Sequence, residues 1–401
     1  MNARTRTVLA TALALGIAAG PAAAALAASA PRPAATSTAA KAPAFGTPDA
    51  KALAAAIAGL PGDTATAALV RVSGTSGAWR GSSGVHDVRS GRPADPDARF
   101  RAGSVTKVFT AATVLQLATE KRLDLDRPVR AYLPELIPAA YKKVTVRQLL
   151  NHTSGLPPAD LPGTTVEEWY ENRFVIHTPR EMVASATAKR AEFPAGTRQH
   201  YLNINYTVAG LLIERVTGHT YESEVARRIL KPLDLHGTSY PGTDPRIHGP
   251  HNHGYQRMRL DDGTTGLRDV SVWGATDGWA AGDIISTTAD LERFTEALFR
   301  GRVVRGPLLE EMFMLPGPSV RDYESDAPAA YSAGLTSWRL GGHRVWGKTG
   351  GRWGYNAGIG GTRDLSRTLV YSVNSTDAKG QGANDVVMGL IVSAFGAPTR
   401  E

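Results

Sequence analysis

A serine and a lysine three residues apart, Ser104 and Lys107, form the pair in this sequence best suited to nucleophilic chemistry. The spacing places both side chains on one face of a helix, within reach of each other. A lysine amine beside a serine hydroxyl can take its proton and make the serine a nucleophile. Ser-x-x-Lys pairs also arise by chance and then lie on a surface, so this pair gains meaning only from companions elsewhere in the chain.

Two further motifs supply what acyl transfer through a serine needs besides the nucleophile, namely a proton carrier and groups that bind substrate. Tyr201 and Asn203 lie just before a predicted helix, and Lys348-Thr349-Gly350 follows a predicted strand. A tyrosine hydroxyl near two lysine ammonium groups is expected to have a lowered pKa and to carry protons. Each residue alone would also fit a packing or surface role, but their joint occurrence favours a catalytic site.

The elements that position these residues are predicted to be strands near both ends of the chain and helices between them. Short apolar runs bounded by turn residues predict strands at residues 67–72, 77–87, 333–340, 344–347, 357–361 and 368–373. Apolar residues at helical spacing predict helices at residues 49–60, 104–120, 145–151, 179–188, 205–217, 221–229, 287–299 and 384–395. This order indicates an α+β fold whose sheet is built from both ends of the chain, with a helical lobe inserted between its strands.

The N-terminal segment has the pattern of an export signal. Basic Arg4 and Arg6 precede an apolar, Ala-rich run, and Ala25-Leu26-Ala27 fits a small-x-small cleavage site. We therefore expect a signal peptide at residues 1–27 and a secreted bacterial protein, either free or associated with the cell wall. An uncleaved N-terminal anchor is the alternative.

The remaining chain divides into a linker and one domain. Residues 28–48 contain mainly Ala, Pro, Ser and Thr, a composition that predicts a disordered linker. Residues 49–398 carry the predicted helices and strands and are expected to form a single domain. No later stretch is long and apolar enough to cross a bilayer, so we expect no stable membrane span after cleavage.

Composition limits the partners of the chain. Its 401 residues carry a net charge of +8 and include no cysteine. Lys and Arg are scattered rather than gathered into a stripe, so we expect no nucleic-acid partner, with attraction to an anionic cell wall as a weaker alternative. A secreted chain without cysteine has no disulfides and depends on packing for its stability.

Taken together and in this order, the three motifs resemble those of the serine β-lactamase and penicillin-binding-protein superfamily. Tyr-x-Asn at Tyr201 is similar to the class C β-lactamase and D-alanyl-D-alanine carboxypeptidase branch. The flanks at residues 100–107, 145–156, 208–214 and 279–287 are similar to that branch as well. The resemblance implies a β-lactamase/transpeptidase-like fold, an antiparallel sheet flanked by N- and C-terminal helices with an inserted all-helical lobe.

The resemblance also implies a role for each matching residue. Ser104 would be the acylated nucleophile, Lys107 its activating amine, and Tyr201 the general base that later protonates the leaving amine. The backbone N–H groups of Ser104 and Gly351 would form the oxyanion hole. The residues implied to bind substrate are Asn203, Lys348, Thr349 and Gly350. No metal or cofactor is implied.

Gly351 replaces a serine or threonine that many relatives carry. The chain also departs from the soluble actinobacterial carboxypeptidases of this branch in two places. Lys348 stands where they often have histidine. Those enzymes also place an arginine before the last motif to hold the terminal carboxylate of the substrate. Arg339 is the candidate for this role here. Because the sequence does not fix the register of its strand, it leaves open how the site recognises a substrate carboxylate.

Three other sets of residues, two of histidines and one of tryptophans, have expected roles outside the motifs. His152 lies in the turn Asn151-His152-Thr153-Ser154-Gly155, where we expect it to shape the loop by hydrogen bonding. The histidines of the loop at residues 247–253 are expected to be solvated, because a loop broken by Pro and Gly offers a metal no rigid support. Trp273, Trp279 and Trp353 lie near the motifs and would line the substrate cleft or pack in the core.

The function implied is a secreted serine hydrolase, most specifically a D-alanyl-D-alanine carboxypeptidase that acts on cell-wall peptides and is acylated by penicillins at Ser104. Its partners would be a cell-wall peptide or a β-lactam, and we expect a monomer. Alternatives on the same fold are a class C-like β-lactamase, an esterase, and a D-amino-acid amidase or peptidase. A non-catalytic protein that binds cell-wall peptides or penicillin is the alternative from another class.

Overall fold

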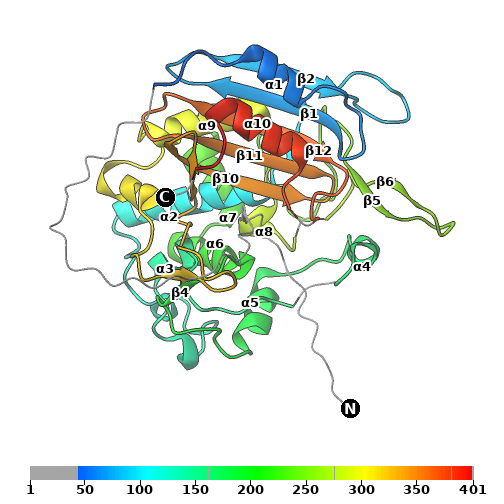
Figure 1. Ribbon diagram of the computed structural model, residues 1–401. Coiled ribbons are helices and arrows are strands. Elements are labelled where there is room, and N and C mark those ends of the chain that lie inside the picture. Colours follow the sequence, from blue (N-terminus) through cyan, green and yellow to red (C-terminus); the bar gives the residue numbers. More distant parts are fainter. Residues whose placement is uncertain (1–43, 161–162, 275, 381, 400–401) are drawn as a thin grey trace, which may run out of the picture.

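The computed structural model describes residues 44–160, 163–274, 276–380 and 382–399 (Figure 1). The predicted signal peptide and most of the predicted linker lie outside these residues. The rest of the chain forms one large sheet with helices on both of its faces and a helical lobe beside it (Figure 1). No helix in the described ranges has both the length and the apolar character that a membrane span requires.

The central sheet is antiparallel and joins the two ends of the chain. Its six strands have the order β2-β1-β12-β11-β10-β9. Their bounds are β1 Ala65–Ser73, β2 Trp79–Gly84, β9 Thr336–Leu340, β10 His343–Arg352, β11 Tyr355–Thr362 and β12 Thr368–Ser375. Because β1 pairs directly with β12, with Leu69 opposite Ser372, the predicted sheet from both termini is confirmed.

Two helices from opposite ends of the chain cover one face of this sheet (Figure 1). They are α1 (Ala50–Ala56) and α10 (Asp385–Phe395), and their apolar residues form one buried cluster with strand residues such as Val70 and Val373. Each helix has a side-chain cap: Asp49 accepts from Ala52 N, and Asn384 accepts from Val386 N. The packing of apolar side chains therefore ties both termini to the sheet in a chain without disulfides.

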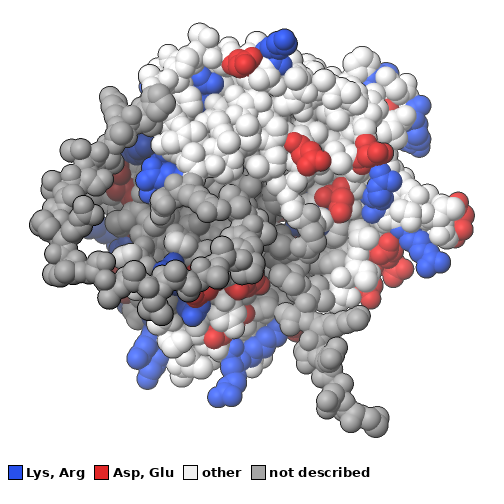
Figure 2. All heavy atoms as spheres, viewed as in Figure 1, with Lys and Arg blue, Asp and Glu red and all other residues white. Residues whose placement is uncertain are grey.

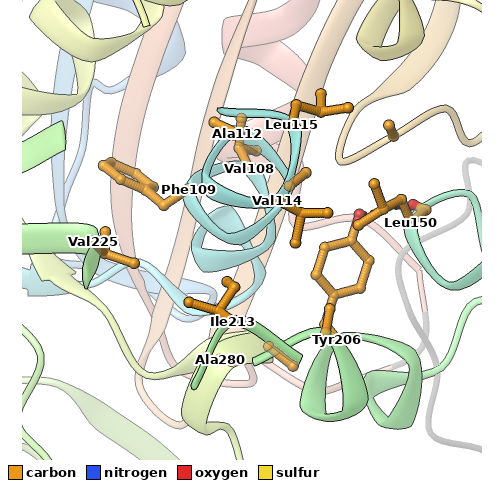
Figure 3. Packing of buried hydrophobic residues seen from close by; sticks show 14 of the residues in the cluster. Val108, Phe109, Ala112, Val114, Leu115, Leu150, Tyr206, Ile213, Val225 and Ala280 are labelled. Carbon is orange, nitrogen blue, oxygen red and sulfur yellow. Dashed lines mark hydrogen bonds between the residues drawn. The ribbon is translucent and has the colours of Figure 1, made fainter. Parts of the chain in front are cut away.

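The opposite face of the sheet carries α9 (Thr288–Phe299) and the larger core cluster. At the centre of this cluster lies α2 (Thr106–Thr119), which is buried on almost every side, including polar residues such as Thr106, Lys107 and Thr110. Figure 3 shows α2 residues such as Val108 and Phe109 packed among lobe residues that include Leu150, Tyr206, Ile213 and Ala280. The helix that follows Ser104 is thus fixed by the core.

The inserted lobe is helical, as predicted. It contains α3 (Val146–Leu150), α4 (Val166–Glu171), α5 (Pro179–Thr187), α6 (Asn203–Thr217), α7 (Tyr221–Val225), a π-helical turn (Ala226–Leu230) and α8 (Trp279–Gly282). Four 3₁₀ segments, at Gly103–Val105, Val129–Ala131, Ala139–Tyr141 and Gly306–Phe313, connect or extend these elements. A capping box starts α5, in which Thr178 and Glu181 each satisfy a backbone N–H of the other.

Three small strand pairs complete the fold. They are β3 (Phe100–Arg101) with β7 (Ile285–Ser286), β4 (Arg198–Gln199) with β8 (Arg321–Asp322), and the hairpin of β5 (Tyr255–Arg259) and β6 (Thr265–Asp269). The hairpin projects from the right side of the view in Figure 1. Figure 2 shows Lys and Arg interspersed with Asp and Glu over the described surface of one face, which agrees with the mixed surface predicted from the sequence.

The structure corrects two predicted boundaries near the motifs. The strand predicted at residues 344–347 runs on to Arg352, so Lys348-Thr349-Gly350 lies inside β10 and not after it. Helix α6 begins at Asn203, two residues before the prediction. The glycines of β10 disguised the strand, because glycine weakens strand propensity. Here they are required by close approach: a Cβ on Gly347 would overlap the Ile359 carbonyl of β11.

Candidate active site

Ser104 lies in a tight 3₁₀ turn, Gly103–Val105, between β3 and α2. Gly103 has a φ of 52°, which glycine adopts without strain. The turn contacts β10 backbone to backbone: a Cβ on Gly103 would lie 2.7 Å from the Gly351 N, and one on Gly350 would lie 2.8 Å from the Ser104 N. The glycines of both segments therefore bring the N–H groups of Ser104 and Gly351, the predicted oxyanion hole, into one small region.

This contact leads to a prediction for Gly350→Ala. The new methyl group would overlap the Ala102 carbonyl, so the turn that carries Ser104 must shift. We expect activity to fall at least about 100-fold, since small displacements of reacting groups are that costly, and stability to fall by about 1–3 kcal/mol. Gly317→Ala is the matched control, because its Cβ meets nothing within 4 Å. Equal activity of the two variants would show that the contact does not position Ser104.

Lys107 is completely buried, one helical turn after Ser104. Its Nζ donates to Ser104 Oγ at 3.1 Å, to Asn203 Oδ1 at 2.7 Å and to the Ala281 carbonyl at 2.8 Å. Burial, followed by repulsion from Lys348 and Lys379, lowers the pKa of Lys107 well below its usual value. A buried amine with a low pKa and a serine hydroxyl at hydrogen-bond distance can accept the proton of that hydroxyl.

Tyr201 lies beside both lysines of the motifs. Its ring centroid is 4.9 Å from Lys107 Nζ and 4.6 Å from Lys348 Nζ, and the ring packs between His152 and Tyr331 at centroid distances of 4.5 and 4.8 Å. The hydroxyl is buried and has no hydrogen-bond partner in the described part of the chain. A buried hydroxyl without a partner costs free energy, so its presence points to use by a bound molecule.

The predicted lowering of the Tyr201 pKa is wrong. Burial raises the pKa of Tyr201 well above its usual value, and the neighbouring Tyr331 raises it further, while the nearby Ser104 hydroxyl acts in the opposite direction. The lysines do not reverse this effect, because burial favours their own neutral forms. Without substrate, Tyr201 is therefore a neutral phenol that can pass a proton on, and not a preformed tyrosinate.

His152 shapes the backbone in front of this site, as the sequence predicts. It is buried, has a φ of 61°, and its Nδ1 accepts from Leu202 N at 3.4 Å and from Asn205 Nδ2 at 3.3 Å. Burial and the charges of Lys107 and Lys348 lower the pKa of His152 well below its usual value, which keeps the ring neutral. A neutral ring nitrogen can accept these bonds, and they hold the backbone between Tyr201 and Asn203.

Lys348 lies in β10, opposite Ile359 of β11, and is almost fully buried. Its Nζ donates to the Thr349 carbonyl at 2.8 Å. Burial, with a smaller contribution from Lys379, lowers the pKa of Lys348 to about 7. The β9 strand stops pairing with β10 at Gly347, so the following segment of β10 is open toward the serine.

The predicted residues open into one cleft of about 380 Å³. It is lined by Ser104, Tyr201, Asn203, Lys348, Thr349, Gly350 and Gly351. Its apolar wall includes Trp169 of α4 and Trp353 after β10, whose ring centroids are 6.0 Å apart. Trp353 therefore lines the cleft and also packs in a core cluster with Trp273. Trp273 and Trp279 are buried in core clusters and do not line the cleft. The cleft joins a polar reacting end to an apolar surface suited to an acyl group.

Arg339, the predicted carboxylate-binding residue, does not line the cleft. It lies in β9 opposite Arg344, four positions before Lys348 along β10. With a rise of about 3.3 Å per strand residue, this register puts it about 13 Å from the motif. The register of an antiparallel pair cannot be read from one strand alone, so the sequence offered no means to exclude Arg339.

Sequence reasoning missed several charged residues that line the cleft, among them Asp277, Arg352 and Lys379. Arg352 binds Asp277 through two hydrogen bonds of 2.8 Å each, and their side chains are 7% and 17% exposed. Arg352 lies only two residues after Gly350, a proximity that could have signalled it. Asp277 and Lys379 belong to no motif, and only the fold brings them to the cleft.

The Asp277–Arg352 pair yields a prediction for stability. In Arg352→Ala, the Asp277 carboxylate remains buried without a counter-charge, which typically costs about 3–5 kcal/mol. The free energy of unfolding in urea measures this loss. Arg246→Ala, which breaks an exposed pair with Asp244, is the control and should change stability by less than about 1 kcal/mol. Equal losses in the two variants would contradict the importance of burial for this pair.

Comparison with known proteins agrees with this geometry. The family model described as Beta-lactamase matches residues 50–390. A D-stereospecific amidohydrolase from Streptomyces sp. has 32% sequence identity and a TM-score of 0.73, over 87% of this chain and 99% of that one. A D-amino acid amidase from Ochrobactrum anthropi SV3, with 24% identity, 86% and 96% coverage and a TM-score of 0.70, shares the fold.

Curated relatives match over shorter regions. Protein flp of Staphylococcus aureus (strain N315) is 29% identical over 164 residues, which are 40% of this chain and 32% of the relative. Esterase EstB of Burkholderia gladioli is 31% identical over 199 residues, which are 46% of this chain and 50% of the relative. The chain thus spans between a third and a half of the length of these relatives. Since the family model matches most of the chain, the protein belongs to the Beta-lactamase family, within the serine β-lactamase/transpeptidase superfamily.

Proposed function

We propose that this protein is a serine hydrolase that works through an acyl-enzyme at Ser104. The observation that carries the proposal is the 3.1 Å contact between Lys107 Nζ and Ser104 Oγ at the reacting end of the cleft. The low pKa of Lys107 supports its role as the base that activates the serine. A protein that only binds its ligand requires neither this contact nor the unpaired hydroxyl of Tyr201.

In the proposed first half-reaction, Ser104 Oγ forms a bond to the acyl carbon while its proton passes to Lys107. The carbonyl electrons move onto oxygen, and the N–H groups of Ser104 and Gly351 stabilise the resulting charge. The tetrahedral intermediate then collapses, and the bond to the leaving group breaks. Tyr201 donates a proton to the leaving amine and regains one from Lys107.

In the second half-reaction, water attacks the acyl-enzyme and restores the serine. Tyr201, reprotonated in the first half, and Lys107 again move the proton, this time from water to Ser104 Oγ. Asn203 would hold the amide of the acyl group. Its Oδ1 accepts from Lys107, so its Nδ2 can donate to a carbonyl of the substrate. Lys348, Thr349 and Gly350 would orient the substrate along the open segment of β10.

The specific activity we propose is D-alanyl-D-alanine carboxypeptidase action on cell-wall peptides. Two lysines of the cleft, Lys348 and Lys379, support this choice. The carboxylates that line the same cleft already have partners: Asp160 pairs with Lys189, Asp277 with Arg352, and Asp377 accepts from Gln256. A leaving group that carries a carboxylate suits such a surface. Penicillins present a comparable acyl donor and carboxylate, so we also propose that they acylate Ser104.

A second candidate is a D-amino-acid amidase. It is favoured by the likeness to the D-stereospecific amidohydrolase, which extends over nearly all of that chain. An esterase, favoured by the partial likeness to EstB, and a class C-like β-lactamase would use the same serine. These activities differ in the leaving group and in how fast water attacks the acyl-enzyme, and not in the nucleophile.

The test compares two substrates at equal concentration, an N-acetylated peptide ending in D-alanyl-D-alanine and the amide of D-phenylalanine. We expect release of D-alanine to exceed release of ammonia at least about tenfold in kcat/KM, a difference of about 1.4 kcal/mol. Ammonia release alone would reject the carboxypeptidase and support the amidase. The Ser104→Ala variant controls for contaminating hydrolases.

We further propose that the protein acts outside the cytoplasm and as a monomer. Cell-wall peptides lie beyond the membrane, and the predicted signal peptide at residues 1–27 would carry the chain there. Detection of the protein in culture medium, with an N-terminus at Ala28, tests the export. Sedimentation of the purified protein tests the oligomeric state.

A further inference from the structure

A short turn between β12 and α10 lies directly against the strand that carries the last motif. The turn runs from Asp377 to Gly380 and closes with a backbone bond of 3.3 Å from Gly380 N to Asp377 O. A Cβ on Gly351 would lie only 3.1 Å from the Ala378 carbonyl. The absence of a side chain at residue 351 therefore leaves the space that the turn occupies.

Two side chains from neighbouring strands hold this turn in place. Asn356 of β11 donates from Nδ2 to the Ala378 carbonyl at 3.1 Å. Gln256 of β5 donates from Nε2 to Asp377 Oδ1 at 3.1 Å. The turn is thus anchored at its first two residues, and these bonds fix the position of Lys379 next to the cleft.

Lys379 lines the same cleft as Ser104 and Lys348 and is accessible to solvent. In the described part of the chain, no carboxylate lies within ion-pair distance of its ammonium group. The charged groups around it are Lys348, Lys107, the Asp277–Arg352 pair and Asp377 of the same turn. Arg352 already binds both oxygens of Asp277, and Asp377 accepts from Gln256. Lys379 is therefore a cation in the cleft without an anion of its own.

The surroundings of Lys379 disfavour this lone charge. Crowding by the protein, followed by repulsion from Arg352, lowers the pKa of Lys379 to about 8, while Asp277 acts in the opposite direction. An anion bound between Lys379 and Lys348 would relieve this repulsion and favour the charged form of both amines. The cluster thus suits a negatively charged group of the substrate.

We propose that Lys379 is a specificity-determining residue that binds a carboxylate on the leaving group of the substrate. This inference rests on the proposed serine hydrolase function. It assigns to Lys379 the carboxylate-binding role that was expected of Arg339. Gly351 favours this arrangement, since a Cβ there would lie only 3.1 Å from the Ala378 carbonyl and would press on the turn. Lys348 and Thr349, adjacent in β10, would complete the site for the carboxylate.

The test uses two esters of N-acetyl-D-alanine that differ only in the charge of the leaving group, the 3-carboxyphenyl and the 3-carbamoylphenyl ester. The measured quantity is the ratio of their kcat/KM values. We expect the wild-type protein to favour the carboxyphenyl ester at least about tenfold, as expected for a hydrogen bond to a charged group. In Lys379→Met this ratio should fall toward one. In Lys379→Arg, which keeps the positive charge, most of the preference for the carboxyphenyl ester should remain.

Lys142→Met is the matched control, because Lys142 does not line the cleft, and it should keep the wild-type ratio. A wild-type ratio near one, or a ratio that Lys379→Met leaves unchanged, would overturn the proposal. Both esters need only a serine that accepts an acyl group. Failure to release D-alanine from a peptide would therefore reject the carboxypeptidase without affecting this test, and failure to cleave either ester would reject the hydrolase and the inference together.

Discussion

Replacing Ser104 with Ala is expected to lower kcat by about 10⁶, the loss seen when the nucleophile of other serine hydrolases is removed. The fold should persist, because Ser104 lies in a turn fixed by backbone contacts and its hydroxyl contacts only side chains of the site, such as Lys107. Removing that hydroxyl changes stability by about 1 kcal/mol at most. A large loss of activity with an unchanged urea midpoint would thus identify a chemical role.

The measurement is steady-state hydrolysis of an activated ester, with thermal unfolding recorded on the same sample. Ser393→Ala in α10 is the control, because it removes a similar hydroxyl far along the chain and outside the cleft lining. It should retain full activity. Residual activity of Ser104→Ala above a few per cent would mean that another group attacks the substrate.

The second large effect is expected for Tyr201→Phe. This change removes only the hydroxyl, and loss of a general acid–base group typically costs about 10²–10⁴ in rate. Stability should stay equal or rise slightly, since the hydroxyl is buried without a described hydrogen-bond partner. The variant would then be as stable as the wild-type protein but almost inactive.

The neighbouring Tyr206 offers a control with the opposite pattern. Its hydroxyl is equally buried but donates to the Leu150 carbonyl at 2.7 Å, away from the cleft lining. Tyr206→Phe should therefore lose about 1 kcal/mol of stability and keep its activity. If Tyr201→Phe retained activity and lost stability, its hydroxyl would have a structural role and the proposed proton transfer would be wrong.

Much of the fold was predictable because each element is locally consistent. The apolar runs at both ends of the chain could bury their surface only by pairing with each other, as β1 and β12 do. The spacing of apolar residues after Ser104 predicted the buried helix α2, and the core confirms it. The β5–β6 hairpin escaped prediction because its strands are largely polar and partly exposed.

Within the site, the sequence supplied the residues but not their environments. Ser104, Lys107, Tyr201 and Lys348 line or border one cleft as their motifs suggested. The charge state of Tyr201 was mispredicted because burial favours the neutral forms of both the phenol and its neighbouring lysines. Residue types alone do not reveal such desolvation.

The residue proposed to bind the substrate carboxylate was the hardest part of the site to predict from the sequence. The candidate Arg339 depended on strand register, which pairs it with Arg344 and removes it from the cleft. Lys379 depended on a turn whose place is set by Asn356, Gln256 and the missing side chain of Gly351. Each of these contacts joins segments far apart in the sequence, so no local pattern could have indicated them.

The most direct test of the acyl-enzyme is the mass of the intact protein after rapid mixing with benzylpenicillin and quenching in acid. We expect one adduct of the mass of the drug, mapped to the peptide that contains Ser104 and absent from Ser104→Ala. A long-lived adduct would support the carboxypeptidase, and a brief one with hydrolysed drug would support a β-lactamase. Hydrolysis of the drug without any adduct at Ser104, or an adduct at another residue, would contradict the proposed mechanism.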